Sequence, residues 1–310
     1  MIGSKSKNPA TAVIVSYQSS RTIGLALKAA RRCSSAQLLN VVIVDNNSTD
    51  TTRNIIESEM SWVHPVFSDK NNGFGRGCNI GSQAVNSPYT IFINPDAIVE
   101  PEALRTMLQF MINHPAVGIV GPAIVEGETE RNKKLQITGK RPTPWTILSA
   151  AVPYLNRRSD SRPIVPGSIP FRTGWVCGAV LMIRTDLFKK LNGFDPRFFL
   201  YWEETDLCKR VEDMGFEVWA LGTAVAHHVG GASSNDDEAK IEGSIAKHYF
   251  QSRYYYMIKH HGWLAATIAE VFEFILLCFR TFIDWIRRRP AHRLRTRLQA
   301  PLLSQPEIFN

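Results

Sequence analysis

The chain has 310 residues, of which 44% are hydrophobic and 21% are charged, and its formal net charge is +8. This composition excludes a disordered, collagen-like or low-complexity chain. The five cysteines are scattered, odd in number and without a CxxC pair, which argues against a disulfide framework or a structural zinc site and favours a reducing compartment. Because residues 1–9 lack an apolar stretch, we expect no secretory signal there.

The first half of the chain alternates strand and helix patterns. The patterns predict strands over 11–17, 41–44 and 89–93, and helices over 22–32, 51–60, 76–85 and 101–113. This alternation predicts an α/β fold with a mostly parallel sheet and helices on both of its faces. The polar stretch 127–170 is rich in proline and serine, and we interpret it as a long excursion over the active face.

Regular patterns resume after this stretch. They predict a strand over 176–183, a helix over 203–214, short strands over 216–220 and 224–228, and further helices over 237–256 and 263–289. We expect residues 1–235 to form the main domain and residues 236–310 to form a helical extension.

The segment 263–289 is apolar except for a few charged residues. They fall within a sector of about 100° on a helix: Glu270, Glu273, Arg280, Asp284 and Arg287. No window of 18 uncharged residues exists, so a spanning helix is not expected, and we interpret the segment as an amphipathic helix on an anionic membrane surface. Packing on the protein's own surface and a homodimer interface are the alternatives. The arginines that follow lack interleaved aromatic residues, so we expect no nucleic-acid partner.

Two acidic clusters follow apolar runs, at positions where strands of an α/β sheet present side chains to a ligand. Asn94 and Asp96 follow the strand 89–93, and their oxygens suit Mg²⁺ or Mn²⁺ on a phosphate. Glu203 and Glu204 follow an aromatic run that can raise the pKa of one of them, as a general base requires. A simple turn and an ordinary helix N-terminus are the respective structural alternatives.

Three further segments carry polar groups at predicted strand ends or helix starts. Asp45 can bind a ribose hydroxyl or a base edge, or form a turn. The glycine-rich segment 71–79 can approach a phosphate closely, with Arg76 as a charge partner, or form a tight turn. Its GxGxG spacing excludes the dinucleotide-binding fingerprint. His227 and His228 end the last strand, where an imidazole can complete a metal site or serve structure.

Together these segments resemble the inverting nucleotide-sugar transferases of glycosyltransferase family 2, and most of all the bacterial rhamnosyltransferase-like branch. The resemblance covers about residues 10–235 and rests on the segments 11–17, 44–48, 72–75, 94–97, 193–195, 203–207 and 228–233. It implies a GT-A type fold. Two departures stand out: Asn94 replaces the first aspartate of the DxD-like triplet, and Glu204 replaces the aspartate of a Glu-Asp pair.

The resemblance also implies roles for individual residues. Asp96 and His228 would hold a divalent cation, Mg²⁺ or Mn²⁺. In the other possible alignment, His227 takes the place of His228. Glu204 would be the catalytic base, with Glu203 as the other candidate. The substrate-binding residues would be Ser16, Asp45, Asn47, Asn72, Gly73, Arg76, Asn79, Asn94, Gly178 and Asp206.

The implied function is metal-dependent, inverting hexosyl transfer from a nucleotide-sugar donor, dTDP-rhamnose first, to a glycan or lipid-linked glycan acceptor. The resemblance implies a role in cell-envelope polysaccharide synthesis, in the cytoplasm and peripherally at the inner face of the plasma membrane. A non-catalytic nucleotide-sugar binding module is the alternative, which metal-dependent transfer lost on Asp96→Ala would exclude. A glycosidase is not expected, because it would need neither a phosphate-binding segment nor a metal triplet.

Overall fold

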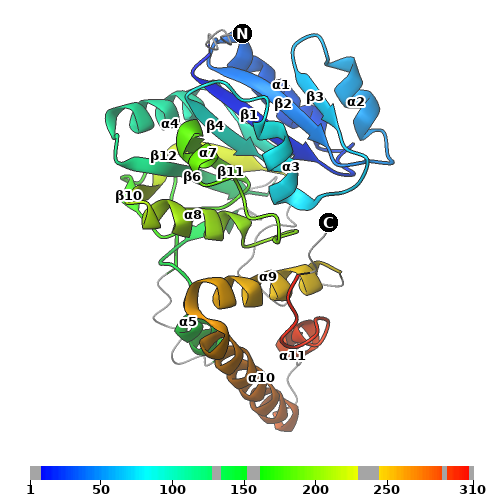
Figure 1. The fold of residues 1–310 in the computed structure, drawn as a ribbon, viewed down its shortest axis with the longest axis vertical. Coiled ribbons are helices and arrows are strands. Elements are labelled where there is room, and N and C mark those ends of the chain that lie inside the picture. The colour runs from blue at the N-terminus through cyan, green and yellow to red at the C-terminus, as the bar shows by residue number, and fades with distance from the viewer. Residues whose placement is uncertain (1–7, 128–133, 152–160, 230–243, 288–291, 307–310) are drawn as a thin grey trace. The chain divides into compact units, whose positions relative to one another are not determined.

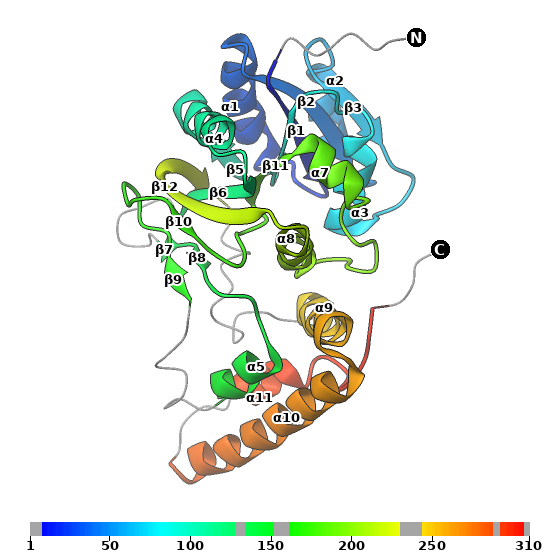
Figure 2. The same cartoon turned by 60° about the vertical axis from the view of Figure 1, so that its left-hand side comes forward.

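The computed structural model describes residues 8–127, 134–151, 161–229, 244–287 and 292–306. The chain forms two compact units (Figures 1 and 2). The first consists of Met1–Gly139, Arg162–Asp195 and Glu204–Ser234, and the second of Lys140–Ser161, Pro196–Glu203 and Asn235–Asn310. The predicted boundary near residue 235 lies outside the described residues and stays a prediction.

The first unit contains a mixed sheet flanked by helices (Figure 1). Its strand order is β10-β12-β6-β11-β4-β1-β2-β3. The strands are β1 (Ala10–Ser16), β2 (Leu39–Asp45), β3 (His64–Phe67), β4 (Tyr89–Ile93), β6 (Val117–Glu126), β10 (Phe171–Arg172), β11 (Val180–Arg184) and β12 (Glu217–His228). Two further strands join them: β5 (Ala97–Val99) pairs with β12, and β7 (Lys134–Leu135) pairs with β6. A separate small sheet consists of β8 (Ile137–Thr138) and β9 (Arg162–Pro163).

The predicted parallel arrangement is present in two blocks. Strands β3, β2, β1 and β4 pair in parallel, and so do β6 and β12. Strand β11 joins the two blocks by antiparallel pairing with both β4 and β6. The carboxyl ends of β1, β2 and β4 therefore meet at one edge of the sheet, where the sequence places its polar groups.

Helices cover both faces of this sheet. They are α1 (Ile23–Ser35), α2 (Thr52–Ser58), α3 (Gly73–Ser82), α4 (Pro101–Asn113), α7 (Thr185–Lys190) and α8 (Glu203–Asp213). Side chains of β1 alternate between the two faces, as the pleat requires. Ala12 and Ile14 belong to the core that includes α1 and α4, whereas Val13 and Val15 belong to the core that includes α3, α7 and α8.

Several predicted elements match the structure closely, and others do not. The predicted bounds 89–93 and 101–113 are those of β4 and α4. The two short strands predicted over 216–228 are one strand, β12, whose pairing with β6 is irregular between Leu221 and Val225. Strand β6 was not predicted. It contains Pro122, which pairs with Leu221 next to this irregularity, where a missing backbone donor is tolerated.

The stretch 127–170 contains more regular structure than predicted. Within its described part lie β7, β8, β9 and the helix α5 (Pro144–Ala151). The helix belongs to the second unit, together with α9 (Ser244–His261), α10 (Trp263–Ile286) and α11 (His292–Arg297). In the part of the chain that the structure describes, no helix combines the length and apolarity that crossing a bilayer requires.

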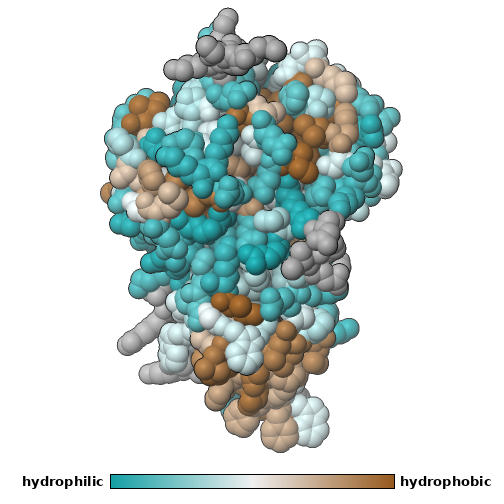
Figure 3. All heavy atoms as spheres, in the orientation of Figure 1, coloured by the Kyte–Doolittle hydropathy of each residue, from teal (hydrophilic) through white to brown (hydrophobic). Residues whose placement is uncertain are grey.

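Helix α10 presents its apolar side to solvent and buries its acids. Glu270 and Glu273 are 0% and 2% exposed and bind the guanidinium groups of Arg253 and Arg297. The opposite side carries what we call the apolar stripe: Leu264, Ile268, Phe272, Ile275, Phe279, Phe282 and Ile286, each at least 47% exposed. Figure 3 shows apolar side chains gathered over α10. Two buried acids can be accommodated because each meets an arginine, so the helix packs through its polar side.

Candidate active site

Polar groups gather where β1 and β2 end. Ser16 and Asp45 are paired neighbours on the two strands, and both side chains are buried. Asp45 Oδ2 accepts a hydrogen bond from the backbone N–H of Ser48 at 3.3 Å. Asp45 Oδ1 is buried without a hydrogen-bond donor among the described residues. A buried acceptor of this kind costs free energy unless a ligand supplies the missing donor.

Asn46 connects this strand end to the start of α3. Its Nδ2 donates to the carbonyl oxygen of Gly73 at 2.9 Å, and its Oδ1 is buried without a donor in the described structure. Gly73 has a φ of +75°, and its N–H donates a further hydrogen bond to Asn71 Oδ1. Asn46 therefore fixes the backbone at which α3 begins.

Most of the glycine-rich segment 71–79 is helical, whereas the sequence predicted a helix only from residue 76. Helix α3 begins at Gly73, earlier than predicted, so Gly75 and Gly77 lie inside it. A Cβ atom on Gly77 would lie 2.6 Å from Val15 Cγ1, and one on Gly81 would lie 2.6 Å from a Val13 methyl. These glycines let α3 pack closely on β1. Asn72, at the N-cap position, and Arg76, in the helix, are both partly buried.

The two acidic clusters are linked where β4 ends and β11 begins. The N–H of Asn94 donates to the carbonyl oxygen of Ala179 at 2.9 Å, which extends the pairing of β4 with β11. The neighbouring Gly178 lies against Glu204, since a Cβ atom at Gly178 would lie 3.5 Å from Glu204 Cδ. Asp96 follows two residues after Asn94. The chain segments that carry Asp96 and Glu204 are thus joined through the backbone at 178–179.

Asp96 and His228 face one another. Ala97 and His228 are paired neighbours in β5 and β12, and the N–H of Val229 donates to the Asp96 carbonyl oxygen. Asp96 Oδ1 and His228 Nε2 lie 2.9 Å apart. Both atoms are buried, yet neither makes a well-directed hydrogen bond within the described residues. Strand alternation places His227 on the other face, where it is exposed, so His228 is the histidine that meets Asp96.

Glu126 lies on the other side of the His228 ring. It ends β6, is 3% exposed, and its Oε1 lies 3.3 Å from His228 Nδ1. Burial lowers the pKa of His228, but the carboxylates of Asp96 and Glu126 outweigh burial and raise that pKa to about 9. The imidazole therefore sits between two acids.

This arrangement fits a divalent cation. An octahedral cation with ligands at about 2.1 Å separates adjacent ligands by about 3.0 Å, close to the distance between Asp96 Oδ1 and His228 Nε2. The described residues contain no group of three or more His, Cys, Asp and Glu side chains that could hold a metal unaided. Two protein ligands suffice where phosphate and water oxygens complete the coordination, as is usual for Mg²⁺.

Glu204 has the electrostatics of a base that works near neutral pH. Its side chain is partly buried in the second position of α8. Burial raises the pKa of Glu204 to about 7, although hydrogen bonds from the backbone at Glu204 and Thr205 act in the opposite direction. Directly before α8, Tyr201 and Trp202 have φ values of +68° and +71°. Positive φ angles at two consecutive non-glycine residues strain the backbone directly before the helix. Strain of this kind clusters at functional sites.

Cys177 lies within electrostatic reach of all three acids. Burial and, to a smaller extent, the negative charges of Glu204, Glu126 and Asp96 together raise the pKa of the Cys177 thiol to about 12. All three carboxylates therefore act on a single side chain next to Gly178. The two acidic clusters, about a hundred residues apart in sequence, converge on the same edge of the sheet.

Some residues predicted to bind substrate have evident structural contacts. The carboxamide of Asn79 both donates to the Phe194 carbonyl oxygen and accepts from the Phe194 N–H, each at 2.8 Å. Asp206 is fully buried and accepts a hydrogen bond from Arg210 Nε at 2.8 Å. Glu203 is buried at the start of α8, and Asn47 is exposed with a φ of +65°. These contacts explain Asn79 and Asp206 without a ligand.

Sequence reasoning missed two residues that the structure brings to the site, Asn46 and Glu126. The sequence does contain a signal for Glu126. This residue follows the apolar run 117–125, just as Asp45 and Asp96 follow apolar runs. The predicted segment 228–233 is described only as far as Val229, and its glycines and serine lie outside the described residues.

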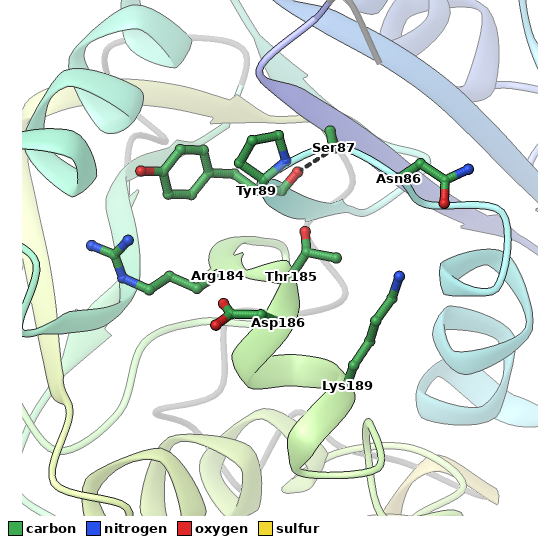
Figure 4. A pocket seen from close by; sticks show the side chains of 8 residues that line it. Asn86, Ser87, Tyr89, Arg184, Thr185, Asp186 and Lys189 are labelled. Carbon is green, nitrogen blue, oxygen red and sulfur yellow. Dashed lines mark hydrogen bonds between the residues drawn. The ribbon is translucent and has the colours of Figure 1, made fainter. Parts of the chain in front are cut away.

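A hollow of about 520 Å³ lies at the other end of β4, away from these acids (Figure 4). It is lined by Asn86, Ser87, Pro88, Tyr89, Arg184, Thr185, Asp186 and Lys189. The guanidinium of Arg184 donates to three backbone carbonyl oxygens, and Lys189 Nζ donates to that of Val85. Since these contacts give both cations structural roles, we assign the hollow no function.

Comparison with known proteins agrees with this geometry. An N-acetylglucosaminyl-diphospho-decaprenol L-rhamnosyltransferase of Mycobacterium tuberculosis is 24% identical over 258 residues, covering 74% of this chain and 78% of the relative. A dTDP-rhamnosyl transferase, RfbF, of Shigella flexneri is 22% identical over 243 residues, covering 74% of this chain and 75% of the relative.

Among solved structures, a mannosyltransferase from Pyrobaculum calidifontis in complex with GDP-Man and Mn²⁺ has a TM-score of 0.55 at 13% identity, over 94% of this chain and 84% of that one. The likeness identifies the fold as GT-A type, as expected from the sequence. The family model for glycosyl transferase family 2 matches residues 11–189, more than half of the chain. The chain therefore belongs to glycosyl transferase family 2.

Proposed function

We propose that this glycosyltransferase moves rhamnose, with inversion, from dTDP-rhamnose to a lipid-linked glycan acceptor. The observation that carries the proposal is the convergence of the Asp96–His228 pair and Glu204 on one edge of the sheet. The choice of sugar and acceptor is supported by the two rhamnosyltransferase relatives, one of which is named for a decaprenol-linked substrate.

In this proposal the ends of β1 and β2 bind the nucleotide. The unsatisfied Oδ1 of Asp45 accepts a hydrogen bond from the base or ribose, and Ser16 lies beside it. Asn47 and the start of α3, with Asn72, Gly73 and Arg76, face the remainder of the nucleotide. We leave Asn79 out of this set because its carboxamide holds Phe194.

Asp96 and His228 would hold Mg²⁺ or Mn²⁺, with Asn94 as a neighbouring neutral oxygen. A cation bound there stabilises the negative charge that develops on the departing nucleoside diphosphate. Because the described residues supply only two strong ligands, the donor's phosphate oxygens would complete the site, which would couple cation binding to donor binding.

Glu204 would accept the proton of the acceptor hydroxyl. As that oxygen bonds to the anomeric carbon, the bond from this carbon to the diphosphate oxygen breaks, and its electron pair leaves with the nucleoside diphosphate. A pKa of about 7 lets Glu204 be ionised and still basic at neutral pH. Gly178, which lies against Glu204, leaves room beside the carboxylate because it has no side chain.

Replacing Asp96 with alanine tests the metal role. We expect Asp96→Ala to lose Mn²⁺ binding in the presence of dTDP and to lower rhamnosyl transfer by about 100-fold or more. Mn²⁺ binding is read by electron paramagnetic resonance, and transfer by release of dTDP. Asp186→Ala, which removes an exposed aspartate at the far end of β4, is the matched control and should behave as wild type. Full activity in Asp96→Ala would refute the proposal, and donor binding without any transfer in wild type would favour a non-catalytic binding module.

The apolar stripe of α10 supports attachment to an anionic lipid surface, where a lipid-linked acceptor would be found. Trp263 and Trp285, 63% and 71% exposed, flank the stripe, as tryptophans do at membrane interfaces. The exposed Arg287 and Arg295 lie just beyond it in sequence and supply positive charge. We place the enzyme at the cytoplasmic face of the membrane on this basis.

Vesicle flotation tests this attachment. A full-length variant with Phe272, Phe279 and Phe282 changed to glutamine is expected to bind vesicles of 30% phosphatidylglycerol at least about tenfold more weakly than wild type, because exposed apolar area drives insertion. The matched control changes Leu25, Met60 and Ile112, three exposed apolar residues of the first unit, to glutamine. Equal flotation of both triple variants would refute the attachment. A dimer-to-monomer change in lipid-free solution, confined to the first variant, would instead assign the stripe to a homodimer interface.

A further inference from the structure

Glu126 lies against the Nδ1 side of the His228 ring. The two residues are paired neighbours on the parallel strands β6 and β12, so their side chains leave the sheet on the same face. Glu126 Oε1 lies 3.3 Å from His228 Nδ1, and both side chains are almost fully buried. His228 is thus held from the side opposite to Asp96.

Glu126 would select one tautomer of the imidazole when a cation is bound. A neutral histidine carries its proton on one ring nitrogen and a lone pair on the other. With a cation shared by Asp96 Oδ1 and Nε2, the carboxylate of Glu126 would keep the proton on Nδ1 and leave the lone pair on Nε2 for the cation. The opposite tautomer would direct an N–H at the position that a cation needs. Metal-binding histidines are commonly oriented by an acid in this way.

Glu126 is itself held in place. Gln136 Nε2 donates to the same Oε1 atom, and the Gln136 backbone donates to the carbonyl oxygen of Ile124 at 3.0 Å. Strand β7 is another neighbour of β6, and its Lys134 pairs with Glu126. A chain of contacts therefore runs from Gln136 through Glu126 to His228, and each member is fixed by strand pairing or by a hydrogen bond.

We propose that Glu126 is the positioning residue for His228, fixing its Nδ1–H tautomer so that Nε2 can bind the divalent cation together with Asp96. The inference rests on the proposed function, since it assigns a purpose to Glu126 only if His228 is a ligand. Glu126 itself touches neither the cation nor the sugar in this scheme.

Mn²⁺ binding in the presence of dTDP, followed by electron paramagnetic resonance, tests the inference. Glu126→Ala is expected to weaken Mn²⁺ binding by about 10- to 100-fold. Glu126→Gln should recover most of the affinity, because its amide oxygen can still accept the Nδ1–H bond. In full-length protein labelled with ¹⁵N and loaded with Mg²⁺, the His228 signals should report Nδ1–H in wild type and in Glu126→Gln, and lose that pattern in Glu126→Ala.

Asp96→Ala distinguishes failure of the proposed metal site from failure of the proposed positioning role of Glu126. If wild type and Asp96→Ala bind Mn²⁺ equally, or wild type binds none, the proposed metal site is wrong and this inference falls with it. If Asp96→Ala loses binding while Glu126→Ala retains it, only the positioning role is overturned. The same holds if Glu126→Gln is as weak as Glu126→Ala. Melting temperatures of all variants identify any that fail to fold, and Glu126→Gln, close to wild type in shape, keeps the test decisive.

Discussion

Glu204→Gln is expected to lower the turnover number for rhamnosyl transfer by about 10²- to 10⁴-fold and to leave donor binding nearly unchanged. Glutamine has almost the same shape as glutamate but cannot take a proton from the acceptor hydroxyl. Donor affinity depends on the ends of β1 and β2 and on the cation ligands, so it should survive the change. Steady-state kinetics give the first quantity, and isothermal titration with dTDP and Mn²⁺ gives the second.

Two further variants make this result specific. Glu203→Gln tests whether the neighbouring acid is the base instead. Glu203 is buried at 4% exposure, whereas Glu204 lies against Gly178 at the converging acids, so we expect Glu203→Gln to retain turnover. Glu102→Gln, on an exposed position of α4, controls for the loss of one carboxylate. An inactive Glu203→Gln beside an active Glu204→Gln would move the base by one residue.

The raised pKa of Glu204 gives the same prediction a pH signature. Because the base must be ionised, kcat/KM should rise with pH below about 7 and level off above it. The pKa is raised on folding, so ionising Glu204 costs stability as the pH rises through about 7. Glu204→Gln removes this cost. The variant should therefore melt at a higher temperature than wild type at pH 8, and the difference should shrink at pH 5.

Local sequence patterns predicted most of the elements that build the site. The β-branched and apolar runs of β1, β2 and β4 are short, continuous and bounded by polar residues. This pattern is typical of strands buried on both faces. Asp45 and Asp96 follow such runs directly, so their position at the sheet edge could be predicted. Their convergence with Glu204 was expected only from the resemblance to the family, because it depends on the antiparallel insertion of β11 and on the backbone contact between Asn94 and Ala179.

Two features escaped prediction for physical reasons. Strand β6 contains Pro122, which normally argues against a strand, and only its partner's irregularity at 221–225 accommodates it. The glycines of α3 suggest a loop, since their helical role depends on the valines of β1 against which they pack. The resemblance favoured His228 over His227, whereas the sequence pattern alone left this choice open because it depends on strand register.

The direction in which α10 faces was also beyond the sequence. A helix with one charged sector is ordinarily expected to turn that sector to water. Here Glu270 and Glu273 turn inward, because Arg253 and Arg297 on neighbouring helices meet them. The two arginines and two glutamates form a buried network with no net formal charge, and Phe250 packs against both guanidinium groups. Partners 17 to 27 residues apart in sequence leave no local periodic signal.

Arg253→Met is expected to destabilise the protein by roughly 3–5 kcal/mol, because it leaves two buried carboxylates with one arginine, Arg297, which contacts Glu270. Arg253 is 3% exposed and donates to both acids. Replacing Arg253 and Arg297 with methionine and both glutamates with leucine should recover most of that loss, since an apolar core does not need the charges. Unfolding followed by urea titration and circular dichroism measures both effects.

The pair Arg280–Asp284 on the same helix supplies the matched control. Its atoms lie 3.8 Å apart, and its side chains are 36% and 22% exposed. A partly solvated ion pair contributes about 0–1 kcal/mol, so Arg280→Met should cost no more than that. Equal losses in Arg253→Met and Arg280→Met would mean that the network does not hold the helices together. Because the network also turns the apolar stripe outward, Arg253→Met should weaken vesicle flotation while the quadruple variant, with its helix held by apolar packing, retains it.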